Sequence, residues 1–200
     1  MIAIIDYGAG NIFSVKNALD YLGVENKLTA DRNEICAADE IILPGVGAFP
    51  WAMKMLRDSG LVDTIREEAK KKPFLGICLG MQLIFDKGYE FEETDGLRLI
   101  GGKVEKIDRK DMIIPHMGWN ELEINRDCPI LKGLPEHPYV YFVHSYAAVC
   151  DDANVSAYCD YGGKITALVY DGKYVYGSQF HPEKSGAAGL KMLKNFSELK

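Results

Sequence analysis

The sequence predicts one α/β domain over residues 1–200, in which helices flank a mostly parallel central sheet and an antiparallel β extension follows. Three observations support this fold class. Short apolar runs alternate with helical patterns in the first half, as they do in βαβ units. Short alternating segments with glycine turns dominate the second half, as in antiparallel hairpins. No repeat, linker or low-complexity segment divides the chain, so a single domain is expected.

The first half is expected to contain three strands and the helices that connect them. Apolar residues of the first helix recur at helical spacing, and Gly23 follows as its expected C-cap. The strands are expected at 1–8, 40–45 and 73–77, and the helices at 11–23 (with Ile12, Val15, Leu19 and Leu22 on one face), around 51–56, at 61–71 and at 79–88.

The second half changes character after about residue 100. A β-prone run is followed by consecutive hairpins, whose turns are expected at Gly162–Gly163 and Asp171–Gly172. A closing helix is predicted, with Ser185 as its N-cap. The expected β segments are 101–107, 118–124, 139–149 and 155–180, and the helix covers 185–200.

Composition excludes several classes of function. The net charge of -6, from 23 basic and 29 acidic side chains, argues against a general affinity for nucleic acid or anionic membranes. No apolar run approaches the ~20 residues that span a bilayer, and the first residues lack the features of a signal peptide. The five cysteines are odd in number and without C-x-x-C spacing, so we expect no disulfide framework, metal or cofactor, and a cytoplasmic location.

One cysteine stands in a pattern typical of a nucleophile. Cys78 follows a predicted strand and precedes a predicted helix, with Gly76 and Gly80 two residues to either side. This order has the form of a nucleophile elbow, in which larger side chains at both glycine positions would collide. The helix N-terminus favours a thiolate, and the N–H of Leu79 is expected to point toward an oxyanion. The alternative is a buried cysteine at a tight turn.

A histidine and a glutamate near the end of the chain complete the pattern. His181 ends the last predicted strand, and Pro182 favours an extended conformation there. Glu183 is close enough to orient the imidazole and to stabilise its cation. The chain order Cys…His-x-Glu therefore suits a triad for acyl transfer. The alternative is that H-P-E is an ordinary exposed turn.

A glycine-rich loop follows the second strand of the predicted sheet. Gly45, Val46 and Gly47 come directly after this strand, and α/β sheets build their sites at the carboxyl ends of parallel strands. Val46 and Gly47 are expected to supply a second backbone N–H to the oxyanion. The glycines permit a peptide flip, so this part of the oxyanion hole can be absent until it is needed. The alternative is a simple βα turn.

These motifs resemble a known family. "GICLGMQLIF" and "QFHPEKS" are similar to the elbow and the H-x-E element of the class I, or triad-type, glutamine amidotransferases, which implies a flavodoxin-like fold. Within that class, "IDYGAGNIFSV", "ILPGVGAF" and "PHMGWNEL" resemble the glutaminase subunits of imidazole glycerol phosphate synthase. The resemblance spans nearly the whole chain, and the P-G-V-G and P-H-M-G-W-N elements are its most specific parts.

The resemblance implies a reaction and a set of site residues. Cys78 attacks the carboxamide of glutamine, and His181, oriented by Glu183, protonates the leaving ammonia. Water then hydrolyses the thioester to glutamate. Glu90 is the implied partner of the substrate's α-ammonium group. The implied glutamine pocket consists of Gly45, Gly47, Gln82, Glu90, Ser145 and Tyr146.

The resemblance also implies a protein partner. This partner is a (β/α)₈-barrel cyclase subunit, which would use the ammonia to form imidazole glycerol phosphate and an aminoimidazole carboxamide ribotide in histidine biosynthesis. The lone subunit is then expected to be nearly inactive. The residues expected at the interface of the heterodimer are Asn11, Met117, Trp119 and Lys184.

Three alternatives remain open from the sequence. The chain could be a sister glutaminase that serves anthranilate, purine or pyridoxal phosphate synthesis, for which a different oxyanion loop is expected. It could be a cysteine hydrolase of the α/β-hydrolase type, although the acidic triad member of those enzymes precedes the histidine. It could also be a regulatory scaffold without chemistry, against which the intact Cys78, His181 and Glu183 argue.

Overall fold

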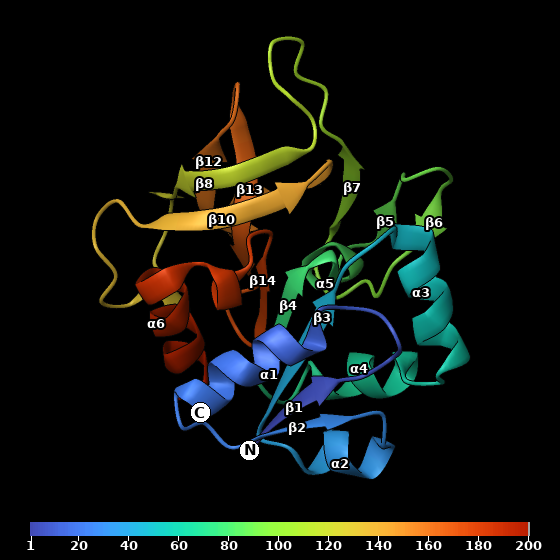
Figure 1. Ribbon diagram of the computed structural model, residues 1–200. Coiled ribbons are helices and arrows are strands. Elements are labelled where there is room, and N and C mark those ends of the chain that lie inside the picture. Colours follow the sequence, from blue (N-terminus) through green and yellow to red (C-terminus); the bar gives the residue numbers. More distant parts are fainter. Residues whose placement is uncertain (200) are drawn as a thin grey trace.

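A twisted eight-stranded sheet runs through the molecule, as the computed structural model of residues 1–199 shows (Figure 1). Its first five strands are parallel and its last three are antiparallel. In spatial order the strands are β2 (Asn26–Thr29), β1 (Ile2–Ile5), β3 (Glu40–Gly45), β4 (Phe74–Cys78), β14 (Val175–Ser178), β13 (Lys164–Tyr170), β12 (Val155–Asp160) and β9 (Glu123–Ile124). The expected fold class, a parallel sheet with an antiparallel extension, is confirmed.

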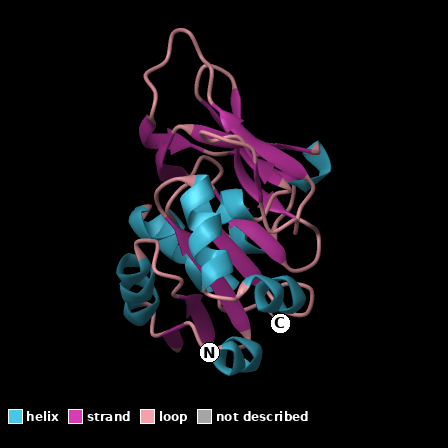
Figure 2. Cartoon of the chain, turned by 90° about the vertical axis from the view of Figure 1, so that its right-hand side faces the viewer, coloured by secondary structure: helices cyan, strands magenta, loops and turns pink. Residues whose placement is uncertain are grey.

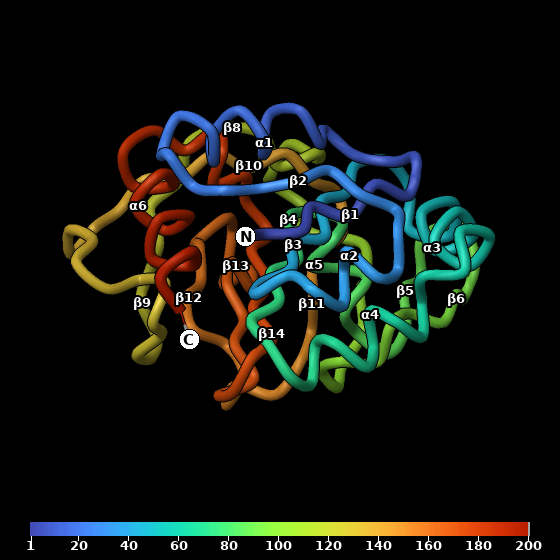
Figure 3. Tube along the Cα trace, turned by 90° about the horizontal axis from the view of Figure 1, so that it is seen from below, coloured from blue at the N-terminus to red at the C-terminus, as the bar shows by residue number. Residues whose placement is uncertain are grey.

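Helices cover both faces of the parallel strands. Seen from below, α1 and α6 lie on one side, and α2, α3 and α4 lie on the other (Figure 3). The parallel strands are therefore buried on both faces, which is why β1, β3 and β4 read as continuous apolar runs. The helices are α1 (Ile12–Tyr21), α2 (Arg32–Ala37), α3 (Phe49–Asp58), α4 (Val62–Glu68), α5 (Leu79–Leu83) and α6 (Gly186–Phe196).

Two smaller sheets lie beyond the carboxyl ends of the parallel strands (Figure 2). One pairs β8 (His116–Glu121) with β10 (Tyr139–His144), and the other has the order β11-β7-β5-β6. The strands of the second sheet are β11 (Tyr146–Cys150), β7 (Gly102–Lys106), β5 (Lys87–Gly88) and β6 (Thr94–Asp95). Three short 3₁₀ helices complete the elements: η1 (Pro129–Leu131), η2 (Asp152–Asn154) and η3 (Pro182–Lys184).

The expected helix over 79–88 is wrong in length, since α5 ends at Leu83. The segment 97–100 runs past the end of α5 and bonds to its last carbonyl groups. Leu97 donates to the carbonyl of Leu83, and two further N–H groups of this segment donate to the carbonyl of Ile84. Because the segment 97–100 donates to these carbonyl groups, they do not accept from the N–H groups of a further helical turn, and the chain continues into β5.

The β-prone run over 139–149 forms two strands rather than one. It divides at Ser145, where β10 leaves to pair with β8 and β11 begins to pair with β7. The sequence also did not single out β2 and α2, which complete the sheet edge. The hairpins over 155–180 are confirmed as β12, β13 and β14.

Ser185 precedes the last helix as expected, but its hydroxyl does not cap it. The hydroxyl instead donates to the carbonyl of His181 at 2.6 Å and accepts from the N–H of Tyr141 at 3.0 Å. The side chain therefore ties the H-P-E turn to β10. Lys200, the last residue of the expected helix and domain, lies outside the described residues. Within residues 1–199, no helix combines the length and apolar character needed to cross a bilayer.

Candidate active site

The backbone around Cys78 adopts a strained turn between β4 and α5. Its φ and ψ angles of 54° and -109° are rare for a residue with a side chain. A Cβ at Gly76 would lie 2.5 Å from the carbonyl oxygen of Gly80, and one at Gly80 would lie 1.9 Å from that of Leu43 on β3. Glycine is thus required at both positions because main-chain atoms come so close to them. At Gly76 these atoms belong to the elbow itself, and at Gly80 they belong to the neighbouring strand β3.

Two neighbouring parallel strands bring the distant ends of the triad together. β14 lies beside β4, with Ser178 opposite Ile77, so the residues that follow each strand emerge at the same edge. Cys78 ends β4, and His181 follows β14 within three residues. Cys78 and His181 line one cavity of about 290 Å³, and their side chains lie near enough for the sulfur to raise the pKa of the imidazole.

The imidazole of His181 is held between the sulfur of Cys78 and a carboxylate. Its Nδ1 lies 2.8 Å from Oε1 of Glu183, so Nε2 is the atom left to face the sulfur. Both side chains of this ion pair are almost fully buried, with exposed fractions of 3% and 1%. Burial lowers the pKa of His181, but the hydrogen bonds to Cys78 and Glu183 outweigh it and raise the pKa to about 9. At neutral pH the arrangement therefore provides an imidazolium next to the nucleophile.

Most of the expected pocket residues line the same cavity as the triad. Glu90, which reaches it from the loop after β5, accepts from the N–H of Phe49 at 2.8 Å and so holds the start of α3. Burial, and then the charge of Glu90, raises the pKa of Tyr146, which places that carboxylate beside the tyrosine. The expected residues in the cavity lining are Val46, Gly47, Cys78, Leu79, Gln82, Glu90, Ser145, Tyr146 and His181.

Two expected residues lie outside that lining. Gly45 is buried against α5, and a Cβ there would lie 2.7 Å from the amide nitrogen of Gly80. Its place in the structure is close packing against the first turn of α5. Glu183 stands behind His181 and reaches the cavity only through that imidazole.

Sequence reasoning missed four residues that surround the nucleophile. Gln179 is buried and points its Nε2 at the sulfur of Cys78 from 3.9 Å, and its Oε1 accepts from Gln82 at 3.0 Å. Gln179 lies two residues before His181, so its place in the chain was a usable signal. The other three, which line the cavity, are Pro115, Val143 and His144.

The four expected interface residues belong to elements that surround this cavity. Met117 and Trp119 are exposed on the outer face of β8, and Lys184 is exposed on η3. A Cβ at Gly186, at the start of α6, would lie 3.9 Å from the indole of Trp119, so β8 and this turn adjoin each other. Asn11 is half-buried at the N-cap of α1, which packs against η3.

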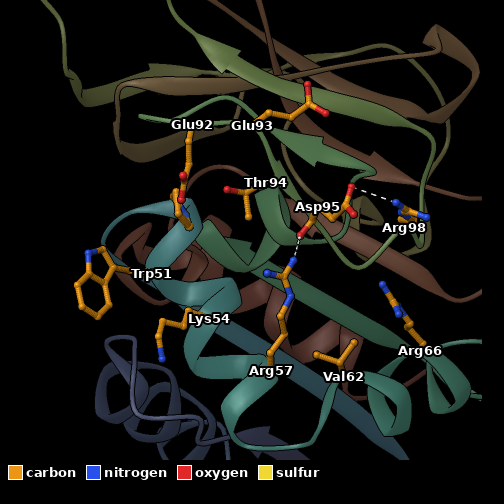
Figure 4. A pocket seen from close by; sticks show the side chains of 11 residues that line it. Trp51, Lys54, Arg57, Val62, Arg66, Glu92, Glu93, Thr94, Asp95 and Arg98 are labelled. Carbon is orange, nitrogen blue, oxygen red and sulfur yellow. Dashed lines mark hydrogen bonds and ion pairs between the residues drawn. The ribbon is translucent and has the colours of Figure 1, made fainter.

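A larger hollow, of about 950 Å³, lies elsewhere, between α3, the start of α4 and the segment 92–98 (Figure 4). Its guanidinium groups are already engaged with the protein. Arg57 donates to the carbonyl of Asp95 at 2.7 Å, Arg66 to that of Leu97 at 3.0 Å, and Arg98 pairs with the Asp95 carboxylate. These contacts join α3 and α4 to the segment 92–98. Neither a cysteine nor a histidine lines this cleft.

Comparison with known proteins identifies the family of this chain. Residues 3–199 match the family described as glutamine amidotransferase class-I. The chain belongs to the class-I glutamine amidotransferases. It is therefore an enzyme of the glutaminase type, and the α/β-hydrolase and scaffold alternatives are wrong.

Curated relatives within this family include subunits of one particular synthase. The chain is 50% identical over 197 residues to the imidazole glycerol phosphate synthase subunit HisH of Bacillus cereus (strain G9842), covering 98% of this chain and 93% of that protein. It is 48% identical over 201 residues to HisH of Listeria monocytogenes serotype 4a (strain HCC23), covering 100% and 96%. The sister glutaminases are not favoured by these matches.

Solved structures support the fold of this amidotransferase. A crystal structure described as glutamine amidotransferase has a TM-score of 0.75 at 22% identity and covers 98% of this chain and 99% of its own. The structure of PurLQS from Thermotoga maritima has a TM-score of 0.74 at 20% identity, covering 98% and 96%. At such identities these two likenesses establish only the architecture.

Proposed function

We propose that this amidotransferase is the glutaminase subunit of imidazole glycerol phosphate synthase, folded as one domain over residues 1–200. The observation that carries the proposal is the cavity that Cys78 and His181 share, with Glu183 bonded to the far side of the imidazole at 2.8 Å. The identity of about 50% with HisH proteins supports the assignment to this synthase.

In the proposed reaction, the thiolate of Cys78 attacks the carboxamide carbon of glutamine. A C–S bond forms, and the carbonyl oxygen becomes an oxyanion that the N–H of Leu79 stabilises, together with the Val46–Gly47 loop. The imidazolium of His181 transfers its proton to the nitrogen, and the C–N bond breaks to release ammonia. His181 then deprotonates a water molecule, whose oxygen attacks the thioester carbonyl carbon. The C–S bond breaks, which releases glutamate and returns Cys78 as the thiolate and His181 as the imidazolium.

The cavity suits glutamine as the substrate. We assign Glu90 to the α-ammonium group, because its carboxylate reaches the cavity while the start of α3 holds it in place. Gln82, Ser145 and Tyr146 form the rest of the pocket together with Gly47. Gly45 supports this pocket from beneath.

The released ammonia is proposed to pass to a cyclase subunit with a (β/α)₈ barrel. That subunit would consume it in forming imidazole glycerol phosphate and an aminoimidazole carboxamide ribotide, two products of a step in histidine biosynthesis. The residues proposed to contact the partner are Met117, Trp119, Lys184 and Asn11. Their elements adjoin the cavity, since β8 follows Pro115, η3 follows His181 and α1 packs against η3. The positive φ of 101° at Gly47 supports a loop that changes its peptide orientation when the partner docks.

Covalent labelling tests the assignment of nucleophile and substrate together. A diazoketone analogue of glutamine should give one adduct per chain by intact-mass spectrometry, and peptide mapping should place it on Cys78. The exposed Cys36 serves as the internal control for general thiol reactivity. Labelling of Cys36 in preference to Cys78, or labelling that excess glutamine does not prevent, would contradict the proposal.

A glutaminase assay tests the partner. The isolated chain should produce glutamate slowly, and adding the cyclase subunit with its nucleotide substrate should raise the rate by orders of magnitude. Full turnover by the isolated chain would contradict a site that forms on demand.

A further inference from the structure

A row of hydrogen bonds crosses the inner face of the β8–β10 pair. His116 is fully buried, with its ring stacked between Phe142 at 4.7 Å and Tyr161 at 3.9 Å. Its Nδ1 lies 2.9 Å from Nε2 of His144, which lines the active-site cavity. Its Nε2 lies 2.8 Å from Oδ1 of the Asn120 side chain, on the same strand.

Acceptors and donors along this row determine where the protons sit. The carbonyl oxygen of Tyr146 only accepts and lies 2.8 Å from Nδ1 of His144, so this nitrogen carries the proton. Burial lowers the pKa of His144 to about 4, which leaves its Nε2 unprotonated at neutral pH. His116 must therefore donate through Nδ1 to reach His144.

The same logic decides the orientation of Asn120. Burial also lowers the pKa of His116, so its Nε2 is an acceptor once Nδ1 carries the proton. With Oδ1 of Asn120 facing this atom, two acceptors would be in contact, so we assign the amide in the opposite orientation, which turns its N–H group toward His116. The row then runs in one direction, from Asn120 through His116 and His144 to the carbonyl of Tyr146.

This carbonyl is also the end of a second set of hydrogen bonds, which starts at the nucleophile. Gln82 donates from Nε2 to the carbonyl of Tyr146 at 3.0 Å and to Oε1 of Gln179 at 3.0 Å. Gln179 in turn points its Nε2 at the sulfur of Cys78. Two sets of donors therefore meet at Tyr146, one from the strand pair and one from the elbow.

We propose that His116 and Asn120 are positioning residues for the glutaminase reaction. They hold His144 in the single tautomer that fixes the carbonyl of Tyr146, and thereby the wall of the glutamine pocket. The proposal rests on the proposed function. It also places the first member of the row on β8, the strand whose outer face carries Trp119.

Two variants separate positioning from simple packing. His116→Phe keeps a ring between Phe142 and Tyr161 but removes both hydrogen bonds, and Asn120→Asp offers acceptors only. Tyr161→Phe is the matched control, because it keeps the ring against His116 and loses only the bond to the carbonyl of Ile113. Asn120→Ala replaces His116→Phe if the latter does not fold.

Two-bond ¹H–¹⁵N correlations of histidine-labelled protein at neutral pH read the tautomers directly. In the wild type, we expect His116 and His144 both to be neutral with the proton on Nδ1. In Asn120→Asp, His116 should carry protons on both nitrogens, whereas Tyr161→Phe should change neither ring. A wild-type His116 protonated on Nε2 would overturn the proposal, whatever the enzyme's activity.

Steady-state kinetics of the complex with the cyclase subunit supply the second readout. His116→Phe should raise the KM for glutamine about five- to tenfold, the scale of one net hydrogen bond, with a much smaller change in kcat. His116→Asn, whose amide N–H lies near the position of Nδ1, should recover part of this loss. Equal KM values for His116→Phe and Tyr161→Phe would overturn the proposal. A wild-type complex that makes no glutamate would instead overturn the proposed function, while the tautomers remain readable.

Discussion

The parallel strands β3 and β4 and the antiparallel pair β8–β10 build opposite sides of one cavity in different ways. Around the elbow, main chain meets main chain, and Gly80 has no space for even a methyl group. Across β8–β10, side chains make the contacts, with His116 and Phe142 inside and Trp119 outside. The main chain of the turn at Cys78 is thus confined by direct contact with β3, whereas the facing wall depends on rotamers and hydrogen bonds.

The two walls suit different tasks of the enzyme. A nucleophile needs a fixed position relative to its base and its oxyanion donors, which backbone packing supplies. A surface that responds to a partner needs parts that move at small cost, which side-chain contacts permit. Substitutions on the two sides should therefore affect different measurements.

The largest effect is expected from removing the nucleophile itself. Cys78→Ala should lower glutamine-dependent synthesis by the complex at least ~10⁴-fold, as for other covalent nucleophiles, while synthesis from added ammonium continues. Product formation measured with each nitrogen source checks this, and Cys36→Ala is the matched control at an exposed cysteine. If Cys78→Ala still used glutamine, Cys78 would not be the nucleophile.

Gly80→Ala tests whether main-chain approach holds the elbow. The new methyl group would meet the carbonyl oxygen of Leu43 at 1.9 Å, so unfolding in urea should show a loss of about 3 kcal/mol or more. Gly101→Ala, where the nearest atom lies 3.8 Å away on the Asp86 carboxylate, should stay within about 1 kcal/mol of the wild type. Similar stability of the two variants would show that the elbow is not confined by β3.

Glu183→Gln tests the base without moving the strands. Removing the carboxylate should lower the pKa of His181 from about 9, because one of the two groups that raise it is gone. The kcat for glutamine should fall about 10²-fold, and an NMR titration of the imidazole measures the pKa. An unchanged pKa would mean that the carboxylate does not act on the ring.

The sign of the linked stability effect follows from the same shift. The folded-state pKa of His181 lies above the ordinary value of 6.5, so protonation stabilises the fold fully below about pH 6.5. This contribution is lost as the pH rises through about 9. Between pH 6.5 and about 9, the free energy of unfolding of Glu183→Gln should therefore change less with pH than that of the wild type.

The smallest effect on the chain itself is expected on the outer face of β8. Trp119→Ala should weaken binding of the cyclase subunit about 30-fold, as for a central interface aromatic, and leave the unfolding free energy nearly unchanged. Trp51→Ala, at an indole that is also exposed and lines the cleft of about 950 Å³, should bind like the wild type. Calorimetric titration compares them, and equal losses would show that β8 is not a special surface.

Local patterns predicted the elbow side better than the facing side. The runs that became β1, β3 and β4 are almost entirely apolar because both faces of a parallel sheet are covered, and the G-x-C-x-G pattern marks a turn whose geometry depends on neighbouring residues. The helix after the elbow was predicted too long, since its end depends on the distant segment 97–100. The break at Ser145 was missed for the same reason, because pairing partners far along the chain decide it.

The sequence alone predicted three features: the strand–helix alternation of a parallel sheet, the tight turn at Cys78 and the H-x-E element. Each of them depends on residues within a few positions of one another. Only the folded chain decided that β14 lies beside β4, which brings His181 to the sulfur across a hundred residues. Folding likewise decided that Gln179 reaches Cys78 and that His116 reaches His144. Such contacts depend on strand pairing and side-chain packing between distant segments, which no local pattern encodes.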